Sequence, residues 1–205
     1  MKANYTFDAE KHIHYINGIR VPGVTTVLKA EGFIDTDFFN DEACYRGNYV
    51  HKACELINRG KLDLNSIKPE FKGYIDAFWT FRQENSPIEF INSEMNVFSE
   101  TWGYAGIIDF ISQTSAGWLY LWDIKTSKVK AKWWKYQLAG YRAAYQEMTG
   151  KRITGCFSLQ LTENGTYKVE QYDDVKENER NWFNILTVHE LKLKEGIIKP
   201  QEEIL

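Results

Sequence analysis

Two aspartates and a lysine stand within the apolar stretches at the middle of the chain. Asp109 interrupts one apolar run, and Asp123 and Lys125 end the next. Burying an isolated carboxylate costs several kcal/mol unless a cation or hydrogen-bond donors compensate it. If the two runs form a hairpin, both carboxylates can reach one metal ion, and two hard oxygen ligands suit Mg²⁺ or Mn²⁺. The residues alone leave two interpretations open, a metal site and a buried structural ion pair.

The place of Asp123 and Lys125 at the end of a strand separates them from similar pairs elsewhere. Alternation puts Leu119, Leu121, Asp123 and Lys125 on one face, and Trp118, Tyr120, Trp122 and Ile124 on the other. An acidic residue two positions before a lysine also occurs in helical patterns, where the two side chains face different directions. Those other pairs are best interpreted as solvated charges.

Five motifs follow one another along residues 20–145. They are Val21-Pro22-Gly23-Val24-Thr25-Thr26-Val27-Leu28, Arg46-Gly47-x-x-x-His51-x-x-x-Glu55, Gly106-x-x-Asp109, Asp123-Ile124-Lys125-Thr126-Ser127 and Gln137-x-x-x-Tyr141. In this order they resemble the RecB-like branch of the PD-(D/E)XK nuclease superfamily. That branch includes RecB-type nuclease domains, phage exonucleases and mitochondrial genome-maintenance exonucleases. Gly23 stands where the mitochondrial type commonly has serine.

The resemblance implies a role for each matching residue. The metal ligands would be His51, Asp109, Asp123 and the carbonyl of Ile124, with Mg²⁺ or Mn²⁺ as cofactor. Lys125 would stabilise the attacking hydroxide and the charge that develops on the phosphorane. Gln137 and Tyr141, one helical turn apart, would hold this lysine or contact DNA. Two further acidic candidates are Glu94, on the preceding strand, and Glu55, which an ordinary i,i+4 pair with His51 would also explain.

Two segments are candidates for DNA binding. Lys128, Lys130 and Lys132 could form a track for phosphates, and Trp133 or its neighbour Trp134 a platform for an unstacked base. Adjacent helical residues face about 100° apart, so one tryptophan should belong to the core. Thr25 or Thr26 would cap a short helix, whose N-terminus binds phosphate well. The alternative interpretation of the lysine run is a solvated surface.

Turn and capping signals predict the N-terminal elements. Asn17-Gly18 is typical of a type I′ hairpin, here over about 13–21. After the short helix at Thr25 or Thr26, a longer helix should begin at the cap Asp35 or Thr36 and run to about Asn58. His12, His14 and His189 match no motif and are interpreted as surface residues.

The rest of the chain changes between the strand period and the helix period. The expected strands are 88–99, 104–113, 117–125, 152–161 and 166–172. The expected helices are one from Pro69 to about 84, then 131–149 and 174–195. This order predicts an α/β fold with a mixed central β-sheet flanked by α-helices. Together with the motifs it implies a restriction-endonuclease-like core.

One domain is expected for the whole chain. The 205 residues include 43% hydrophobic and 15% aromatic residues, enough for one substantial core. We expect an N-terminal hairpin and helices over 1–87, a catalytic core over 88–172 and a C-terminal helix over 173–205.

Composition excludes several classes of protein. A net charge of −3 does not fit a uniformly basic nucleic-acid binder, and it is too small for an acidic DNA mimic. No signal peptide or membrane span is expected, so a cytoplasmic location is predicted, in the host if the gene is from a phage. Three scattered cysteines fit reduced thiols and cannot supply the four-cysteine iron–sulfur cluster of some relatives.

The function that these observations predict is metal-dependent hydrolysis of DNA. An exonuclease is expected, acting on single strands or free ends in recombination, repair or replication, with a recombination or single-strand-binding protein as candidate partner. The alternatives are a structure-specific endonuclease and a non-catalytic DNA-binding module on the same fold. The intact Asp109, Asp123 and Lys125 argue against the second, and a chain without a separate recognition domain argues against sequence-specific cutting.

Overall fold

Two sheets form the framework of the protein. The computed structural model describes residues 3–35, 41–86 and 88–199. An antiparallel sheet near the N-terminus contains β1 (Tyr5–Asp8), β2 (Ile13–Ile16) and β3 (Ile19–Val21). Asn17 and Gly18, between β2 and β3, have φ angles of 53° and 78°. Two consecutive positive φ angles fit the predicted type I′ turn.

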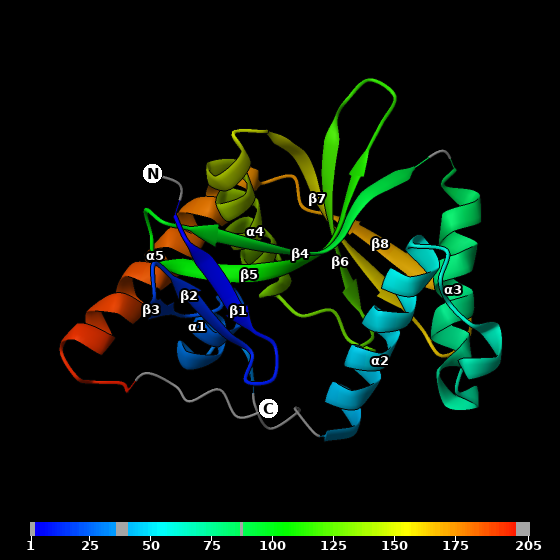
Figure 1. Ribbon diagram of the computed structural model, residues 1–205, viewed down its shortest axis with the longest axis horizontal. Coiled ribbons are helices and arrows are strands. Elements are labelled where there is room, and N and C mark those ends of the chain that lie inside the picture. The colour runs from blue at the N-terminus through cyan, green and yellow to red at the C-terminus, as the bar shows by residue number, and fades with distance from the viewer. Residues whose placement is uncertain (1–2, 36–40, 87, 200–205) are drawn as a thin grey trace.

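The larger sheet is mixed, as predicted. Its strands, in spatial order, are β4 (Glu89–Ser99), β5 (Tyr104–Gln113), β6 (Leu119–Lys125), β7 (Ile153–Leu161) and β8 (Tyr167–Gln171). Neighbours are antiparallel except for β6 and β7, which are parallel. A parallel pair needs a long crossover, and α4 (Trp134–Thr149) provides it. The carboxyl end of β6 therefore leads through a loop into α4 (Figure 1).

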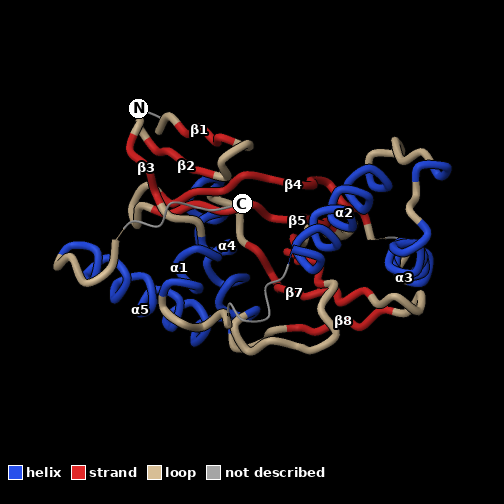
Figure 2. Tube along the Cα trace, turned by 90° about the horizontal axis from the view of Figure 1, so that it is seen from below, coloured by secondary structure: helices blue, strands red, loops and turns tan. Residues whose placement is uncertain are grey.

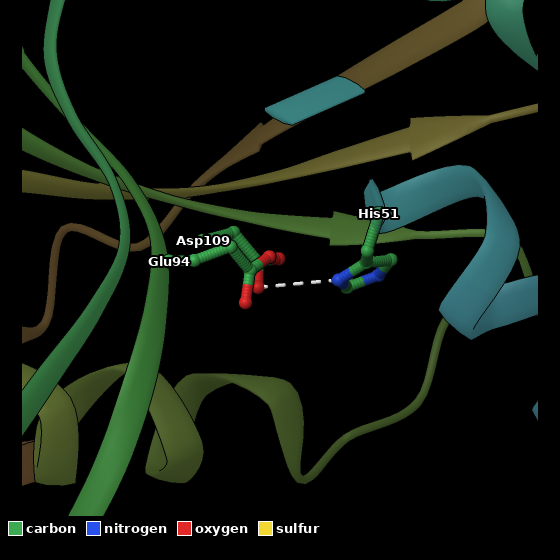
Figure 3. Close-up of side chains that lie close together, drawn as sticks. All are labelled: His51, Glu94 and Asp109. Carbon is green, nitrogen blue, oxygen red and sulfur yellow. Dashed lines mark ion pairs between the residues drawn. The ribbon is translucent and has the colours of Figure 1, made fainter. Parts of the chain in front are cut away.

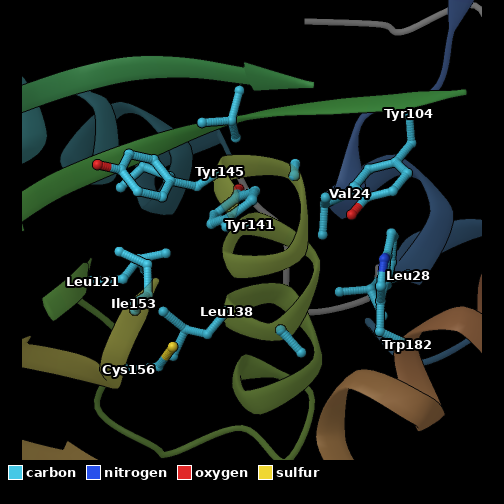
Figure 4. Packing of buried hydrophobic residues seen from close by; sticks show 14 of the residues in the cluster. Val24, Leu28, Tyr104, Leu121, Leu138, Tyr141, Tyr145, Ile153, Cys156 and Trp182 are labelled. Atoms are coloured by element: carbon cyan, nitrogen blue, oxygen red, sulfur yellow. The ribbon is translucent and has the colours of Figure 1, made fainter. Parts of the chain in front are cut away.

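Helices pack on both faces of this sheet. The core with α1 (Val24–Ala30), α4 and α5 (Val175–Lys194) includes Leu119 and Leu121. The core with α2 (Asp41–Asn58) and α3 (Lys72–Glu84) includes Trp122 and Ile124. Figure 2 shows the two groups of helices apart from each other, and Figure 4 shows the first core around α4. The predicted alternation along β6 is thus confirmed.

Several boundaries differ from the prediction. α1 begins at Val24 after Gly23 without a side-chain cap, so the predicted capping by Thr25 or Thr26 is wrong. A 3₁₀ turn, Pro69–Phe71, precedes α3, another stands at Leu64–Ser66, and α4 starts three residues later than expected. Strand β1 was not foreseen. The proposed cap Thr36 lies outside the described residues.

Two histidines that the sequence placed on the surface are buried. His14 is 1% exposed and contacts Tyr5 Oη through Nδ1 at 2.8 Å. His189 is 4% exposed, and its Nδ1 lies 3.0 Å from Glu31 Oε1. Both partners are distant in sequence, so these contacts arise from tertiary packing. No helix in the described part of the chain is long and apolar enough to span a membrane.

Candidate metal centre

Three elements bring a histidine and two carboxylates together. His51 comes from α2, Glu94 from β4 and Asp109 from β5 (Figure 3). One ligand atom of each lies within 4.8 Å of the others, and His51 Nδ1 is 3.2 Å from Asp109 Oδ1. Asp109 is buried, while His51 and Glu94 are partly exposed, so the group is accessible from solvent.

Glu94 has an unusual backbone conformation for a residue within a strand. Its φ angle is 49°, in the left-handed region, which a side chain other than glycine rarely adopts. On either side, Ser93 pairs with Phe110 and Met95 with Ile108, so Glu94 lies opposite Asp109. Such strain costs roughly 1–3 kcal/mol and is concentrated at functional sites. The outlier therefore marks Glu94 as a functional candidate.

The charges of this group perturb one another. Burial, together with the charge of Asp109, raises the pKa of Glu94 to about 7. Burial would lower the pKa of His51, but the charge of Asp109 and the hydrogen bond to it outweigh this effect and raise the pKa to about 9. The shift of His51 and the effect of Asp109 on Glu94 both reflect neighbouring negative charges, which a cation would compensate.

Asp123 lies beside this group, and its carboxylate is held by Lys125. Lys125 Nζ is 2.5 Å from Asp123 Oδ2. Asp123 is 3% exposed, and burial raises its pKa to about 6 against the opposing effect of Lys125. Oδ2 makes no hydrogen bond of good geometry to the described residues, so the lysine compensates it mainly through charge.

Two of the four predicted ligands, His51 and Asp109, belong to this group, and the acidic candidate Glu94 completes it. Asp123 lies outside the group of three. Asp109 faces the end of β6 through its second oxygen, because Ile124 N donates to Asp109 Oδ2 at 2.5 Å. Ile124, whose carbonyl is the fourth predicted ligand, is thereby fixed next to the group.

A chain of hydrogen bonds continues from Lys125 into α4. Lys125 Nζ donates to Gln137 Oε1 at 2.7 Å. Gln137 Nε2 donates to Tyr141 Oη at 2.9 Å and to Thr25 Oγ1 at 3.3 Å. The contact of Gln137 with the lysine is the one that the sequence predicts. Thr25 belongs to this chain of contacts and orients the amide, a role that sequence reasoning missed.

The predicted lysine track is largely paired with carboxylates. Lys128 Nζ lies 2.9 Å from Glu163 Oε1, and Lys130 Nζ lies 2.5 Å from Glu170 Oε1. Lys132 is exposed. Both ion pairs are solvent-exposed, and such pairs contribute about 0–1 kcal/mol, so a phosphate could replace either carboxylate.

The remaining candidates lie at the start of α4, on α1 and on α2. Trp134 is 2% exposed, whereas Trp133 is partly exposed with its ring 4.9 Å from Lys125 Nζ, so the prediction that one tryptophan is buried is confirmed. Thr26 is partly exposed on α1. Glu55 is buried and pairs with Lys52 at 2.6 Å and Arg59 at 2.9 Å, outside the group of three.

Gly106 is required by the packing of Tyr141. A Cβ at this position would lie 2.4 Å from Tyr141 Cε1 and 2.8 Å from Cδ1. Gly106→Ala should therefore displace the ring that orients Gln137, and we expect a loss of about 1–3 kcal/mol in the free energy of unfolding. Urea denaturation measures this loss. Gly47→Ala is the matched control, since its methyl group would meet no described atom within 4 Å beyond its chain neighbours and the backbone of its own helix. Equal stability of the two variants would contradict this packing role.

Comparisons with known proteins support the fold. No protein-family model matches the chain, and no curated protein does. A solved structure from Eubacterium rectale, described as a candidate exonuclease, has a TM-score of 0.52 and 14% identity, covering 86% of this chain and 75% of its own. An alkaline exonuclease from Laribacter hongkongensis has a TM-score of 0.32 and 13% identity, covering 83% and 96%. The first similarity and the mixed sheet confirm an α/β core of the restriction-endonuclease-like fold.

Proposed function

We propose that this chain is a metal-dependent deoxyribonuclease that hydrolyses phosphodiester bonds. The observation that carries the proposal is the group of His51, Glu94 and Asp109 beside a lysine fixed by Asp123 and Gln137. The motif order and the exonuclease description of the Eubacterium rectale protein support the same function.

The donor atoms of the group suit a divalent cation. Two carboxylates and one imidazole nitrogen fit Mn²⁺ and, with water completing the shell, Mg²⁺. The raised pKa of Glu94 fits a pocket that requires positive charge. A bound ion would supply an activated water nucleophile and neutralise charge at the phosphodiester. Asp123 and the Ile124 carbonyl are proposed as further ligands, because both residues adjoin Asp109.

Lys125 is proposed to stabilise the charge that develops on the reacting phosphate. Its ammonium group is held from two sides, by Asp123 Oδ2 at 2.5 Å and by Gln137 Oε1 at 2.7 Å. A cation fixed before the reaction stabilises a transition state without further reorganisation. Gln137 is therefore a positioning residue, and Tyr141 and Thr25 orient it in turn.

Within this class we propose an exonuclease that acts on single strands or free ends. The loop from Thr126 to Trp133 would contact DNA through Lys128, Lys130 and Lys132, with Trp133 as a stacking surface and Thr26 nearby on α1. A single-strand-binding or recombination protein is the proposed partner. In the cell the activity would serve recombination, repair or replication.

Digestion of two end-labelled linear DNA substrates and one closed circular substrate tests the proposal. Linear single-stranded, linear duplex and closed circular single-stranded DNA are incubated with the protein in Mg²⁺, in Mn²⁺ and in EDTA. We expect rapid loss of the linear single strand only with metal, and resistance of the circle of equal sequence. Rapid cutting of the circle would identify an endonuclease instead, and the absence of cleavage of every substrate would contradict the nuclease proposal.

A further inference from the structure

One glycine of the chain has no structural reason in the described residues. Of the 14 glycines, eight have a positive φ angle and five would place a Cβ within 3.4 Å of another atom. Gly47 does neither: its φ lies outside the positive range, and apart from its chain neighbours and the backbone of its own helix, no described atom lies within 4 Å of its Cβ position. Within the described residues, neither the backbone conformation nor the packing requires a glycine at this position.

Glycine at this position weakens the helix. Gly47 lies within α2 (Asp41–Asn58), where glycine is less favourable than alanine because it loses more backbone entropy on folding. It lies one turn before His51, and residues four apart lie on the same face of a helix. The open space therefore adjoins the imidazole that contacts Asp109.

The residue directly before Gly47 carries a positive charge. Arg46 Nε lies 3.5 Å from Thr126 Oγ1, at the end of β6. Among the described residues, Arg46 makes no ion pair. Its guanidinium group has five N–H donors, whose planar arrangement matches the oxygens of a phosphate. Open space at Gly47 and a cation on the residue before it, without an ion pair among the described residues, fit the backbone of a nucleic acid.

We propose that the substrate strand crosses α2 at Gly47. Its sugar–phosphate backbone occupies the space that a side chain would fill, and Arg46 binds a phosphate next to the one at His51 and Asp109. This inference rests on the proposed nuclease function and adds the path of the strand. Gly47 then contributes to binding by leaving room, at the expense of helix stability.

Adding bulk at Gly47 separates this role from a structural one. We expect Gly47→Ala to weaken binding of a fluorescent single-stranded oligonucleotide about tenfold and Gly47→Leu on the order of 100-fold. Binding is measured by anisotropy in Ca²⁺, and cleavage by single-turnover assays in Mg²⁺. The Tm of the alanine variant should rise by about 1–4 °C, because alanine favours the helix. Mn²⁺ affinity should equal that of the wild type.

Asn48→Ala is the matched control. Asn48 is the next residue of α2 and is exposed, and its replacement improves helix propensity without adding atoms. This variant should bind and cleave like the wild type. Wild-type DNA binding by both Gly47 variants would overturn the inference and leave the nuclease proposal intact. A lower Tm or lost Mn²⁺ binding in Gly47→Ala would also overturn it, by showing a structural role. If the wild type cleaves no DNA, the nuclease proposal fails. The anisotropy measurements on the Gly47 variants would still show whether a DNA strand crosses α2 at Gly47.

Discussion

Replacement of Asp109 by asparagine is expected to lower the cleavage rate at least about 1,000-fold, equivalent to about 4 kcal/mol of transition-state stabilisation. One oxygen of Asp109 faces His51 at 3.2 Å, and the other accepts from Ile124 N at 2.5 Å. Asparagine keeps the shape and one acceptor but removes the negative charge that attracts a cation. Mn²⁺ affinity, measured by calorimetry, should fall together with the rate.

The fold should survive this change. Asp109 lies near Glu94 and raises its pKa, so loss of its charge relieves repulsion between the two carboxylates. Asp76→Asn is the control, because Asp76 is an exposed carboxylate that pairs with Lys72 on α3. It should leave metal binding and cleavage unchanged. If Asp109→Asn retained more than a tenth of the wild-type rate, Asp109 would not be a metal ligand.

Replacement of Lys125 by alanine should separate catalysis from metal binding. We expect a single-turnover rate about 100- to 1,000-fold below the wild type, the usual effect of removing one fixed group that stabilises transition-state charge. Mn²⁺ affinity should change little, since the ammonium group contacts Asp123 and Gln137 and lies outside the group of three ligands. A lower cleavage rate without a loss of Mn²⁺ affinity distinguishes the role of Lys125 from that of Asp109, where both should fall.

The same change should also destabilise the protein. Asp123 is 3% exposed, and without Lys125 its charge would be buried without a partner, which costs about 3–5 kcal/mol. Assays should therefore be made well below the Tm of the variant. Lys72→Ala, which removes a lysine from an exposed ion pair, is the control for both the cleavage rate and the free energy of unfolding. A Lys125→Ala protein that cleaves at the wild-type rate would show that this lysine has no part in catalysis.

Local patterns account for what the sequence predicts well. The Asn17-Gly18 turn needs two positive φ angles, and these residue types are the ones that adopt them. The two-residue period of β6 determines that Asp123 and Lys125 share a face. Helical spacing puts Gln137 one turn from Tyr141. Gln137 accepts a hydrogen bond from Lys125 and donates one to Tyr141. Each prediction depends on neighbours within a few residues.

The features that the sequence left open or did not show depend on tertiary contacts. Glu94 joins His51 and Asp109 because β4 and β5 pair in one register and the backbone at Glu94 is left-handed. The sequence names Glu94 as an acidic candidate on the strand before Asp109, but no local pattern shows that it joins His51 and Asp109 while Asp123 lies beside them. The partners of Lys128 and Lys130 come from Glu163 and Glu170, near or on β8, more than 30 residues later. No local pattern encodes these pairings.

Anomalous diffraction from crystals grown with Mn²⁺ tests the central claim, which is that His51, Glu94 and Asp109 form the metal centre. We expect a peak at bonding distance, about 2–2.5 Å, from a nitrogen of His51 and from a carboxylate oxygen of both Glu94 and Asp109. A peak that contacts Asp109 and Asp123 but neither His51 nor Glu94 would contradict it, as would the absence of a peak at saturating Mn²⁺.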